Sequence, residues 1–485
     1  MQSMSDLDTI GGAAGGMGPR GPEWLQGKGS DLGSLYSAIW KLAWPAFLGQ
    51  GIRAVVMFLV RIIVSQLGDK AYNSVNIGMM VFFVIMTLIA AVAVGTTALV
   101  ALSWGAGDRK RAGEVLQQSL LWGCLLCVFI SLVGMPTSRF IYRLLGSDPE
   151  TVKMGTGYLL WLYGATPLLA PGFFLAAALG AAGDTRTPMI GGVAMGLLGL
   201  FLSYGLILGK LGLPRLGILG AALALDISFF FFTVFLGYLF LANRTIVKLP
   251  LRGWRLDVKT GLAIFKIGIP TALEWTLIQA GMLMYVKVIN NYGTQAAAGY
   301  FTGVAVFMFA QTPAMGFQVA ASTLVGQSVG ARRFDRAASA FRHCAAMSAG
   351  FMAVMGLFLY ALVNPSILGH LFNELSPEAI QYARSYITLL IWSMPLMGVA
   401  FSLGGGLRGA GDTVPPLTAS LLGMYGGRIL AAFGLYALLH PPVVVIWCSM
   451  FPDFILRISV LMARLNSGKW KETKAVKSGR SQAQL

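Results

Sequence analysis

The stretch LRGAGDTVPP, residues 407–416, has a twin earlier in the chain, LGAAGDTRTP at residues 179–188. An offset of 228 residues carries the shared glycine, aspartate, threonine and last proline of the earlier copy onto those of the later one. Nearer the start of each half the offset is 225, which relates Pro45 to Pro270 and Gly105 to Gly330. This ordered series of matches indicates an internal duplication, with a three-residue insertion in the second half.

Each copy of the motif lies where one long apolar run stops and the next begins. Glycine permits a tight turn, an Asp-Thr pair can accept hydrogen bonds from the free amides of a helix start, and proline fits the first helical turn. We therefore interpret both copies as structural turns and their aspartates as caps, not catalysts. The turn residues are Gly183, Asp184, Pro188, Gly411, Asp412 and Pro416.

Apolar residues dominate the chain. Of 485 residues 56% are hydrophobic and only 11% are charged, and the mean hydropathy is +0.71. This composition is typical of integral membrane proteins. A helical span needs roughly 20 mostly apolar residues, and backbone groups in lipid must find partners within the protein. The long unbroken runs predict an all-α, polytopic membrane protein.

Basic residues give the chain a net charge of +17. They cluster in some loops and in the C-terminal tail, whereas the loops between these clusters carry fewer positive charges. The positive-inside rule then places the clustered loops and both termini in the cytoplasm, so we assign the charge to membrane topology and not to nucleic-acid binding. The clusters fall within residues 109–111, 244–259, 332–342 and 469–480.

The apolar runs predict about twelve transmembrane helices in two pseudo-symmetric lobes of six. Six is an even number, so both halves enter the membrane in the same direction and are related by an axis along the membrane normal. The predicted organisation is a disordered cytoplasmic tail (1–34), an N-lobe (35–243), a cytoplasmic linker (244–260), a C-lobe (261–466) and a basic cytoplasmic tail (467–485).

Several motifs in this order resemble the multidrug and toxic compound extrusion (MATE) family of secondary transporters. Besides the two turns they are SWGAGDRKRA at 103–112, GQSVGARRFDRA at 326–337, SDPE at 147–150, GILGAALAL at 217–225 and SGKWK at 467–471. The resemblance implies twelve helices around a central cavity and alternating access driven by a sodium or proton gradient. It also implies a bacterial inner membrane, a small-molecule substrate and no cofactor beyond the coupling ion.

Three acidic residues in or beside the spans are candidates for ion coupling, because a carboxylate inside a membrane is costly. Glu274 lies one turn after Pro270, and in some relatives a Glu occupies this part of the seventh helix; a buried ion pair with an arginine is the alternative. Asp453 precedes Arg457 by four residues, which favours an intrahelical ion pair. Asp226 has no such local partner and is a candidate proton site.

Two acidic positions that are frequent in the family are absent from this chain. The position late in the first helix is Val60, which is followed by Arg61, and the tenth-helix stretch PLMGVAFSLGGG contains no aspartate. These departures leave the choice between a proton and a sodium ion open.

Arg53 lies about two turns past Pro45 inside an apolar run and should face protein or water. If it faces the cavity, the pocket favours an anionic or zwitterionic substrate, or Arg53 neutralises Glu274. Arg61 is nearer a span end, where it can snorkel to the interface instead. For the aromatic candidates, core or lipid-facing packing is the alternative. The predicted cavity residues are Arg53, Arg61, Tyr300, Phe301 and Gln279.

The leading hypothesis is therefore a monomeric exporter of small organic compounds that works by cation-coupled antiport within the lipid bilayer, with Glu274 as the first candidate for proton coupling. The alternative is a flippase or exporter of an anionic lipid or lipid-linked glycan on the same fold. An enzyme is disfavoured, because no cluster of His, Asp or Cys has the spacing of a metal or nucleophile site. The pair Cys124 and Cys127 lies within an apolar run and predicts no metal site.

Overall fold

A computed structural model describes residues 32–67, 69–144, 149–362 and 376–472. These residues form helices and connecting turns without a strand, and twelve helical segments among them are long and apolar enough to cross a membrane. The all-α prediction of about twelve spans is confirmed. Most of the predicted tail 1–34 and much of the tail 467–485 lie outside the described residues.

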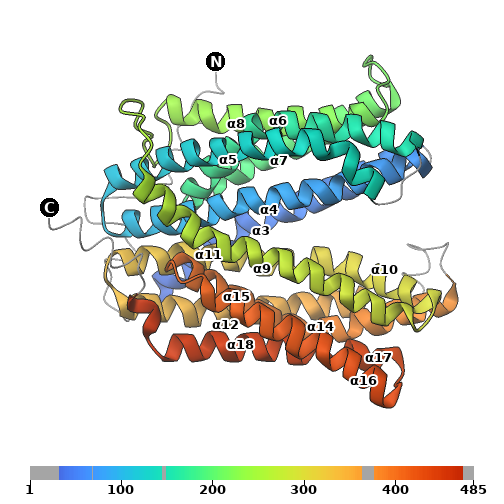
Figure 1. Ribbon diagram of the computed structural model, residues 1–485. Coiled ribbons are helices and arrows are strands. Elements are labelled where there is room, and N and C mark those ends of the chain that lie inside the picture. The colour runs from blue at the N-terminus through green and yellow to red at the C-terminus, as the bar shows by residue number, and fades with distance from the viewer. Residues whose placement is uncertain (1–31, 68, 145–148, 363–375, 473–485) are drawn as a thin grey trace, which may run out of the picture.

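The first lobe contains six long helices, and the second contains six spans of which three are divided (Figure 1). The first six are α3 (Leu32–Ser65), α4 (Asp69–Gly105), α5 (Arg109–Leu144), α6 (Pro149–Ala182), α7 (Arg186–Leu208) and α8 (Ile218–Leu241). The second six are α9 (Val258–Asn290); α10 (Thr294–Ala310) with α11 (Thr312–Gly330); α12 (Phe334–Leu362); α14 (Pro377–Gly409); α15 (Val414–Leu421) with the π-helix η1 (Leu422–Leu430) and α16 (Ala431–Leu439); and α17 (Val443–Trp447) with α18 (Met450–Asn466). A short 3₁₀ turn, η2 (Lys469–Glu472), follows.

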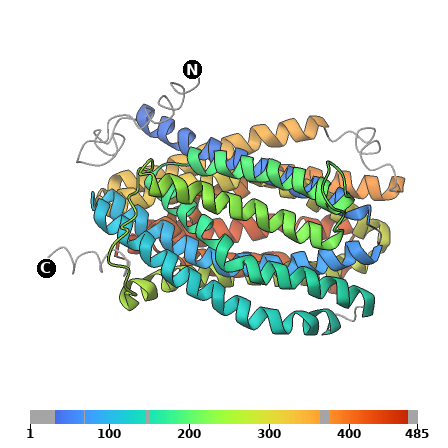
Figure 2. The same cartoon turned by 90° about the horizontal axis from the view of Figure 1, so that it is seen from above.

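Packing between helices repeats from one lobe to the other. Helices α4 and α5 pack on α6 as α11 and α12 pack on α14, and α7 packs on α8 as η1 packs on α18. Two crossed pairs join the lobes, α3 with α11 and α4 with α9. The view turned by 90° shows the helices of both lobes running along a common direction (Figure 2). The duplication that the sequence predicts is therefore visible in the architecture.

Both ends of the described chain lie at the same end of the bundle, because Leu35 near the start of α3 and Trp470 of η2 belong to one hydrophobic cluster. We call this the terminal end. Figure 1 shows the two lobes meeting near it and diverging toward the opposite end.

A seam of close backbone contacts joins the lobes at the terminal end. A Cβ added to Gly105 would lie 1.9 Å from the Gln327 carbonyl oxygen, and one added to Gly330 would lie 2.0 Å from the Leu102 carbonyl oxygen. The two contacts are images of each other under the repeat, since 330 minus 105 and 327 minus 102 are both 225. Only glycine allows α4 and α11 to approach this closely.

We expect Gly330→Ala to force the lobes apart at the terminal end, because its Cβ would overlap the Leu102 carbonyl group. Overpacking of this kind weakens the closed arrangement by about 1–3 kcal/mol. Spin-label distances between Lys110 and Ser467, exposed positions on the two lobes, would then lengthen. Gly350→Ala is the matched control, because its added Cβ meets nothing within 4 Å. Unchanged distances in Gly330→Ala would contradict the role of the seam.

The segment between α8 and α9 is anchored to α5 by hydrogen bonds. The Gln118 side chain donates to the Arg255 carbonyl oxygen at 2.7 Å and accepts from the Asp257 amide at 2.9 Å. The Asp257 carboxylate then caps α9, accepting from the Thr260 hydroxyl and from the amides of Lys259 and Thr260. These hydrogen bonds, that of the Thr260 hydroxyl foremost, hold the pKa of Asp257 below its ordinary value.

Asp257→Ala is expected to destabilise the protein by about 1 kcal/mol, the usual worth of a helix cap. The Asp257 pKa is lower in the folded state than in the unfolded state. The charged cap therefore adds stability above the unfolded pKa of about 3.9, and this stability is lost as the pH falls through the folded pKa. Thermal unfolding at neutral and acidic pH would measure both effects. Asp257→Asn should keep most of the stability, because asparagine caps nearly as well; equal losses in both variants would argue against the cap.

Candidate functional site

A cavity of about 90 Å³ lies inside the first lobe, walled by α3, α4, α7 and α8 together with Tyr158 of α6. Among the described residues that line it most side chains are apolar, and the two charged ones are Arg53 and Arg61. These described lining residues include no aspartate or glutamate. The structure thus brings together the two arginines that the sequence predicts for a cavity.

Arg53 is only partly exposed, and its Nε atom is buried without a hydrogen-bond partner among the described residues. It lies 12 residues before Ser65, the last residue of α3, which is about 18 Å along the helix at a 1.5 Å rise per residue. Arg61 lies only four residues from that end and is exposed. The guanidinium groups therefore occupy an inner and an outer position of one cavity.

Asp226 of α8 is 6% exposed, and neither of its carboxylate oxygens has a hydrogen-bond partner within the described ranges. Its neighbours Leu225 and Ser228 line the cavity. A buried carboxylate without partners is costly in its charged form. Asp226 therefore remains a candidate proton site beside Glu274, the first candidate from the sequence.

Glu274 lies in the second lobe, where it is 4% exposed and fully engaged. One terminal nitrogen of Arg408 lies 2.7 Å from both carboxylate oxygens, and the Ser420 hydroxyl donates to one of them at 2.7 Å. The alternative of a buried ion pair with an arginine is what the structure shows. Arg53 is not that arginine, so the suggestion that it neutralises Glu274 is wrong for this conformation.

Asp453 of α18 is fully buried and contacts two arginines. Arg457 donates from Nε at 2.6 Å, as the four-residue spacing predicts, and the Nε of Arg428 lies 2.9 Å away. Gly423 and Gly427 of the π-helix η1 let α18 approach, because a Cβ at either would lie within 2.7 Å of Asp453 atoms. Asp453 is therefore a structural ion-pair residue in this state.

These two ion pairs belong to one network, because Arg457 also donates to the Ser420 hydroxyl at 3.3 Å. It joins α9, α14, α15, η1 and α18. With three arginines and two carboxylates its formal charge is +3 − 2 = +1. Its carboxylates are thus compensated within the protein. The members are Glu274, Arg408, Ser420, Arg428, Asp453 and Arg457.

The other predicted cavity residues do not join the first-lobe cavity. Tyr300 is 1% exposed and packs edge-to-face against Tyr386, with ring centroids 5.2 Å apart, in the core of the second lobe. Phe301 is 53% exposed, and Gln279 lies on the exposed side of α9. Tyr300 is therefore a packing residue here, which corrects the prediction that it lines a cavity.

The two turn motifs have the same backbone conformation, but their aspartates make different contacts. Gly183 and Gly411 both have positive φ, 107° and 76°, and a helix begins after each. Asp184 accepts hydrogen bonds from the amide and hydroxyl of Thr187, as a cap should. The equivalent position after Asp412 is Pro415, which has no amide hydrogen.

Asp412 instead pairs with the Nε of Arg464 at 2.7 Å. The prediction that it is a cap is wrong. Pro188 and Pro416 lie in the first turns of their helices, as expected.

Arg408 and Ser420 were missed as site residues, although a signal was present in the repeat. Under the offsets of the duplication, the twin of Glu274 is Gly49 and the twin of Arg408 is Gly180. Acid and base are thus both present in one copy only, as expected of two residues that pair with each other. The cavity residues Asn76 and Ser203 carry no comparable sequence signal.

The geometry can now be compared with known proteins. The family model described as MatE matches residues 45–205 and 270–433. The probable multidrug resistance protein NorM of Thermotoga maritima is 26% identical over 435 residues, covering 89% of this chain and 92% of that protein. A protein of the same description from Rhodopseudomonas palustris is 27% identical, covering 81% and 83%.

Among solved structures, an outward-facing multidrug resistance MATE transporter of the MOP superfamily superimposes with a TM-score of 0.85 at 20% identity, covering 94% of this chain and 99% of that one. This likeness shows the shared fold. Twelve membrane-length helices, a duplicated six-helix lobe and the extent of the family match lead to one conclusion. The chain is a multi-pass membrane protein that belongs to the MATE family of transporters.

Proposed function

We propose that the protein exports small organic compounds across a bacterial inner membrane by alternating access, with proton coupling at Asp226. The names of its relatives, which describe probable multidrug resistance proteins, support export of such compounds. The observation that carries the proposal is the pair of repeated lobes, which meet through a glycine seam at the terminal end and diverge toward the opposite end (Figure 1), with a basic cavity inside one of them.

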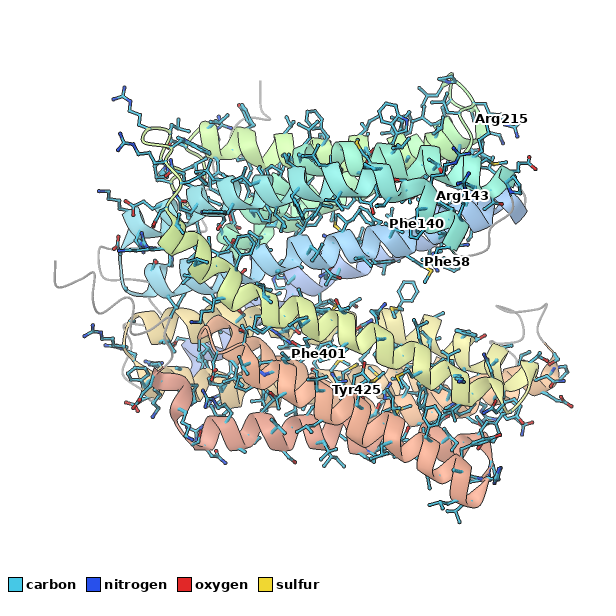
Figure 3. All side chains as sticks on the ribbon, viewed as in Figure 1. Phe58, Phe140, Arg143, Arg215, Phe401 and Tyr425 are labelled. Atoms are coloured by element: carbon cyan, nitrogen blue, oxygen red, sulfur yellow. The ribbon has the colours of Figure 1, made fainter. Side chains whose placement is uncertain are left out.

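Alternating access needs two lobes that can tilt against each other about a contact region. The seam of Gly105 and Gly330 closes the terminal end, while the lobes diverge at the other end (Figure 1). Phe58 of α3 is 52% exposed and points into the space between the lobes (Figure 3). If the basic loops at the terminal end face the cytoplasm, this arrangement is the outward-facing one.

Among the three candidate carboxylates, Asp226 fits ion coupling best. Glu274 and Asp453 already have guanidinium partners at 2.7 and 2.6 Å, so protonation of either would leave a buried arginine unpaired. Asp226 has no hydrogen-bond or ion-pair partner to lose in the part of the chain that the structure describes. A proton needs a single oxygen lone pair, whereas a hard cation is held by several oxygen ligands. This comparison favours a proton over a sodium ion.

Transport in proteoliposomes tests the proposal. Purified protein would be reconstituted, and a panel of labelled cationic, anionic and neutral compounds followed under a pH gradient and, separately, under a sodium gradient. We expect the pH gradient to drive accumulation of at least one compound and the sodium gradient to have no effect at constant pH. If neither gradient moves any compound, export is rejected; if sodium alone does, the assignment to a proton is rejected.

The alternative of an anionic-lipid flippase is favoured by one observation, the cavity whose charged lining residues are both arginines. The same vesicles can carry a fluorescent phosphatidylglycerol and a fluorescent phosphatidylcholine. Faster movement of the anionic lipid alone, with no movement of soluble compounds, would replace the exporter by the flippase.

A further inference from the structure

We propose that the first-lobe cavity recognises a compact amphiphile with a single negative charge, whose acidic head binds Arg53 and whose apolar body rests against the methionine-rich wall. The inference rests on the proposed export function and names the substrate class of that site.

Arg53 differs from the other arginines buried in the membrane-spanning region. Arg408, Arg428 and Arg457 each contact a carboxylate within 3 Å. Arg53 forms no ion pair and no hydrogen bond among the described residues. A guanidinium group cannot give up its charge, and an uncompensated charge inside a membrane protein is costly. An anion that enters the cavity would supply the missing partner.

Within the described ranges no residue stands in for that anion. The carboxylate nearest in sequence to the cavity lining is Asp226, which forms no hydrogen bond or ion pair with Arg53 in that part of the chain. The 18 described residues that line the cavity include no acid. A cationic compound would therefore meet two like charges and no counter-charge in this cavity, whereas an anion would meet two attractive ones.

Arg61 extends the positive potential toward the exposed end of α3. It follows Arg53 by eight residues, which is about 12 Å along a helix. Both side chains line the same cavity. An outer cation followed by an inner one attracts an anion to the mouth and holds it at depth. Arginine suits this task, because its planar group binds carboxylates and phosphates through two hydrogen bonds.

The other lining side chains indicate the chemistry of the rest of the ligand. Met57, Met79 and Met195 face the cavity from three helices, with Phe229 from a fourth. Methionine side chains are flexible and polarisable, so they adapt to apolar bodies of different shapes. The hydroxyls of Ser203 and Ser228 are small polar groups that could satisfy a second oxygen of the head. A volume of about 90 Å³ suits a small acid better than a lipid-linked glycan.

Binding of two matched compounds tests the inference directly. Butyrate and butylamine share a four-carbon chain small enough for the cavity and carry opposite charges at pH 7.5. Their radiolabelled forms would be equilibrated with the full-length protein in phosphatidylcholine nanodiscs, and empty nanodiscs would correct for partition into lipid. We expect the acid to bind at least tenfold more tightly than the amine.

Substitutions at the inner arginine assign the preference to this cavity. We expect Arg53→Met to weaken binding of the acid by about tenfold or more, the usual effect of losing a charged hydrogen-bond partner. The amine should bind as before or better. Arg53→Lys should restore part of the affinity, since it keeps the charge without the planar fork. The matched control is Lys287→Met, which removes an exposed basic residue of α9 in the other lobe and should change nothing.

Each outcome decides the question. Equal or tighter binding of the amine by the wild-type protein overturns the inference, as does unchanged acid binding in folded Arg53→Met. If Arg53→Met does not fold, the wild-type preference and the Arg53→Lys affinity decide. If phosphatidylglycerol binds at this site while butyrate binds weakly, the anion that the cavity recognises is a lipid head group. Export of amines without binding of acids would support the export function and reject this inference. Binding of the acid without any transport would support the binding site and reject the export function.

Discussion

Arg408→Met is expected to lower the free energy of unfolding by about 3–5 kcal/mol, the usual cost of removing one partner of a buried ion pair. The substitution leaves Glu274, which is 4% exposed, with a single neutral partner, the Ser420 hydroxyl. Methionine keeps much of the side-chain volume, so the loss would report the missing charge and not a cavity. Unfolding in a mild detergent, followed by fluorescence as denaturant is added, would measure it.

The double variant Glu274→Gln with Arg408→Met is the decisive control. Glutamine can still accept the hydrogen bond from Ser420, and no unpaired charge remains. We expect the double variant to be more stable than either single variant, because replacing both members of a buried pair is often neutral. A double variant that is as unstable as the sum of the two single variants would show that the 2.7 Å contact contributes no coupling energy.

Asp226→Asn is expected to abolish efflux driven by a pH gradient, with a fall in rate of at least tenfold, while the folded protein remains in the membrane. Asparagine has nearly the same shape as aspartate but cannot exchange a proton. Because the Asp226 oxygens have no hydrogen-bond partners among the described residues, the substitution breaks no ion pair and should leave stability unchanged or raised. Efflux in proteoliposomes and thermal unfolding would be measured on the same preparation.

The matched control is Asp184→Asn, at the turn between α6 and α7, where asparagine also caps a helix. It should retain gradient-driven efflux. Full proton-driven transport in Asp226→Asn would remove Asp226 from the mechanism. Loss of transport together with loss of the folded protein would assign it a structural role instead.

An anionic substrate affects the coupling between Asp226 and the cavity. By charge alone, protonation of Asp226 would strengthen binding of a nearby anion. Antiport requires the opposite, because the proton and the substrate must bind alternately. Mutual exclusion of the proton and the anion would therefore act through the cavity wall, which Leu225 and Ser228, close to Asp226 on α8, help to form. The inside-negative membrane potential would also assist, since moving one negative charge outward gains about 2.3 kcal/mol per 100 mV. Efflux of the acid should accordingly rise when such a potential is imposed without a pH gradient.

Much of the fold could be predicted from the sequence, because the solvent that surrounds it is apolar. In lipid, backbone groups must be satisfied within each helix, so a long apolar run fixes a span almost regardless of its neighbours. The repeat of Leu407 and Leu179, and of Gly330 and Gly105, then fixed the number of lobes and their relative direction. The four-residue spacing of Asp453 and Arg457 predicted a contact along one helix, which the structure confirms.

Contacts between helices were beyond such local rules. Glu274 and Arg408 are 134 residues apart and meet only because α9 and α14 pack near α15. The capping role of Asp412 failed for a local reason, the neighbouring Pro415, and its partner Arg464 lies 52 residues away. The same dependence on packing placed Tyr300 in a core and Arg53 in a cavity.

The sequence by itself determined the membrane setting, the twelve helices and their duplication, because hydropathy and repeated motifs act along the chain. Only the tertiary structure decided which charges are compensated. A buried ion is stabilised or left costly by atoms within about 4 Å of it, and such atoms come from helices far apart in sequence. That distinction separates the paired Glu274 and Asp453 from Asp226 and Arg53, which have no partner among the residues that the structure describes.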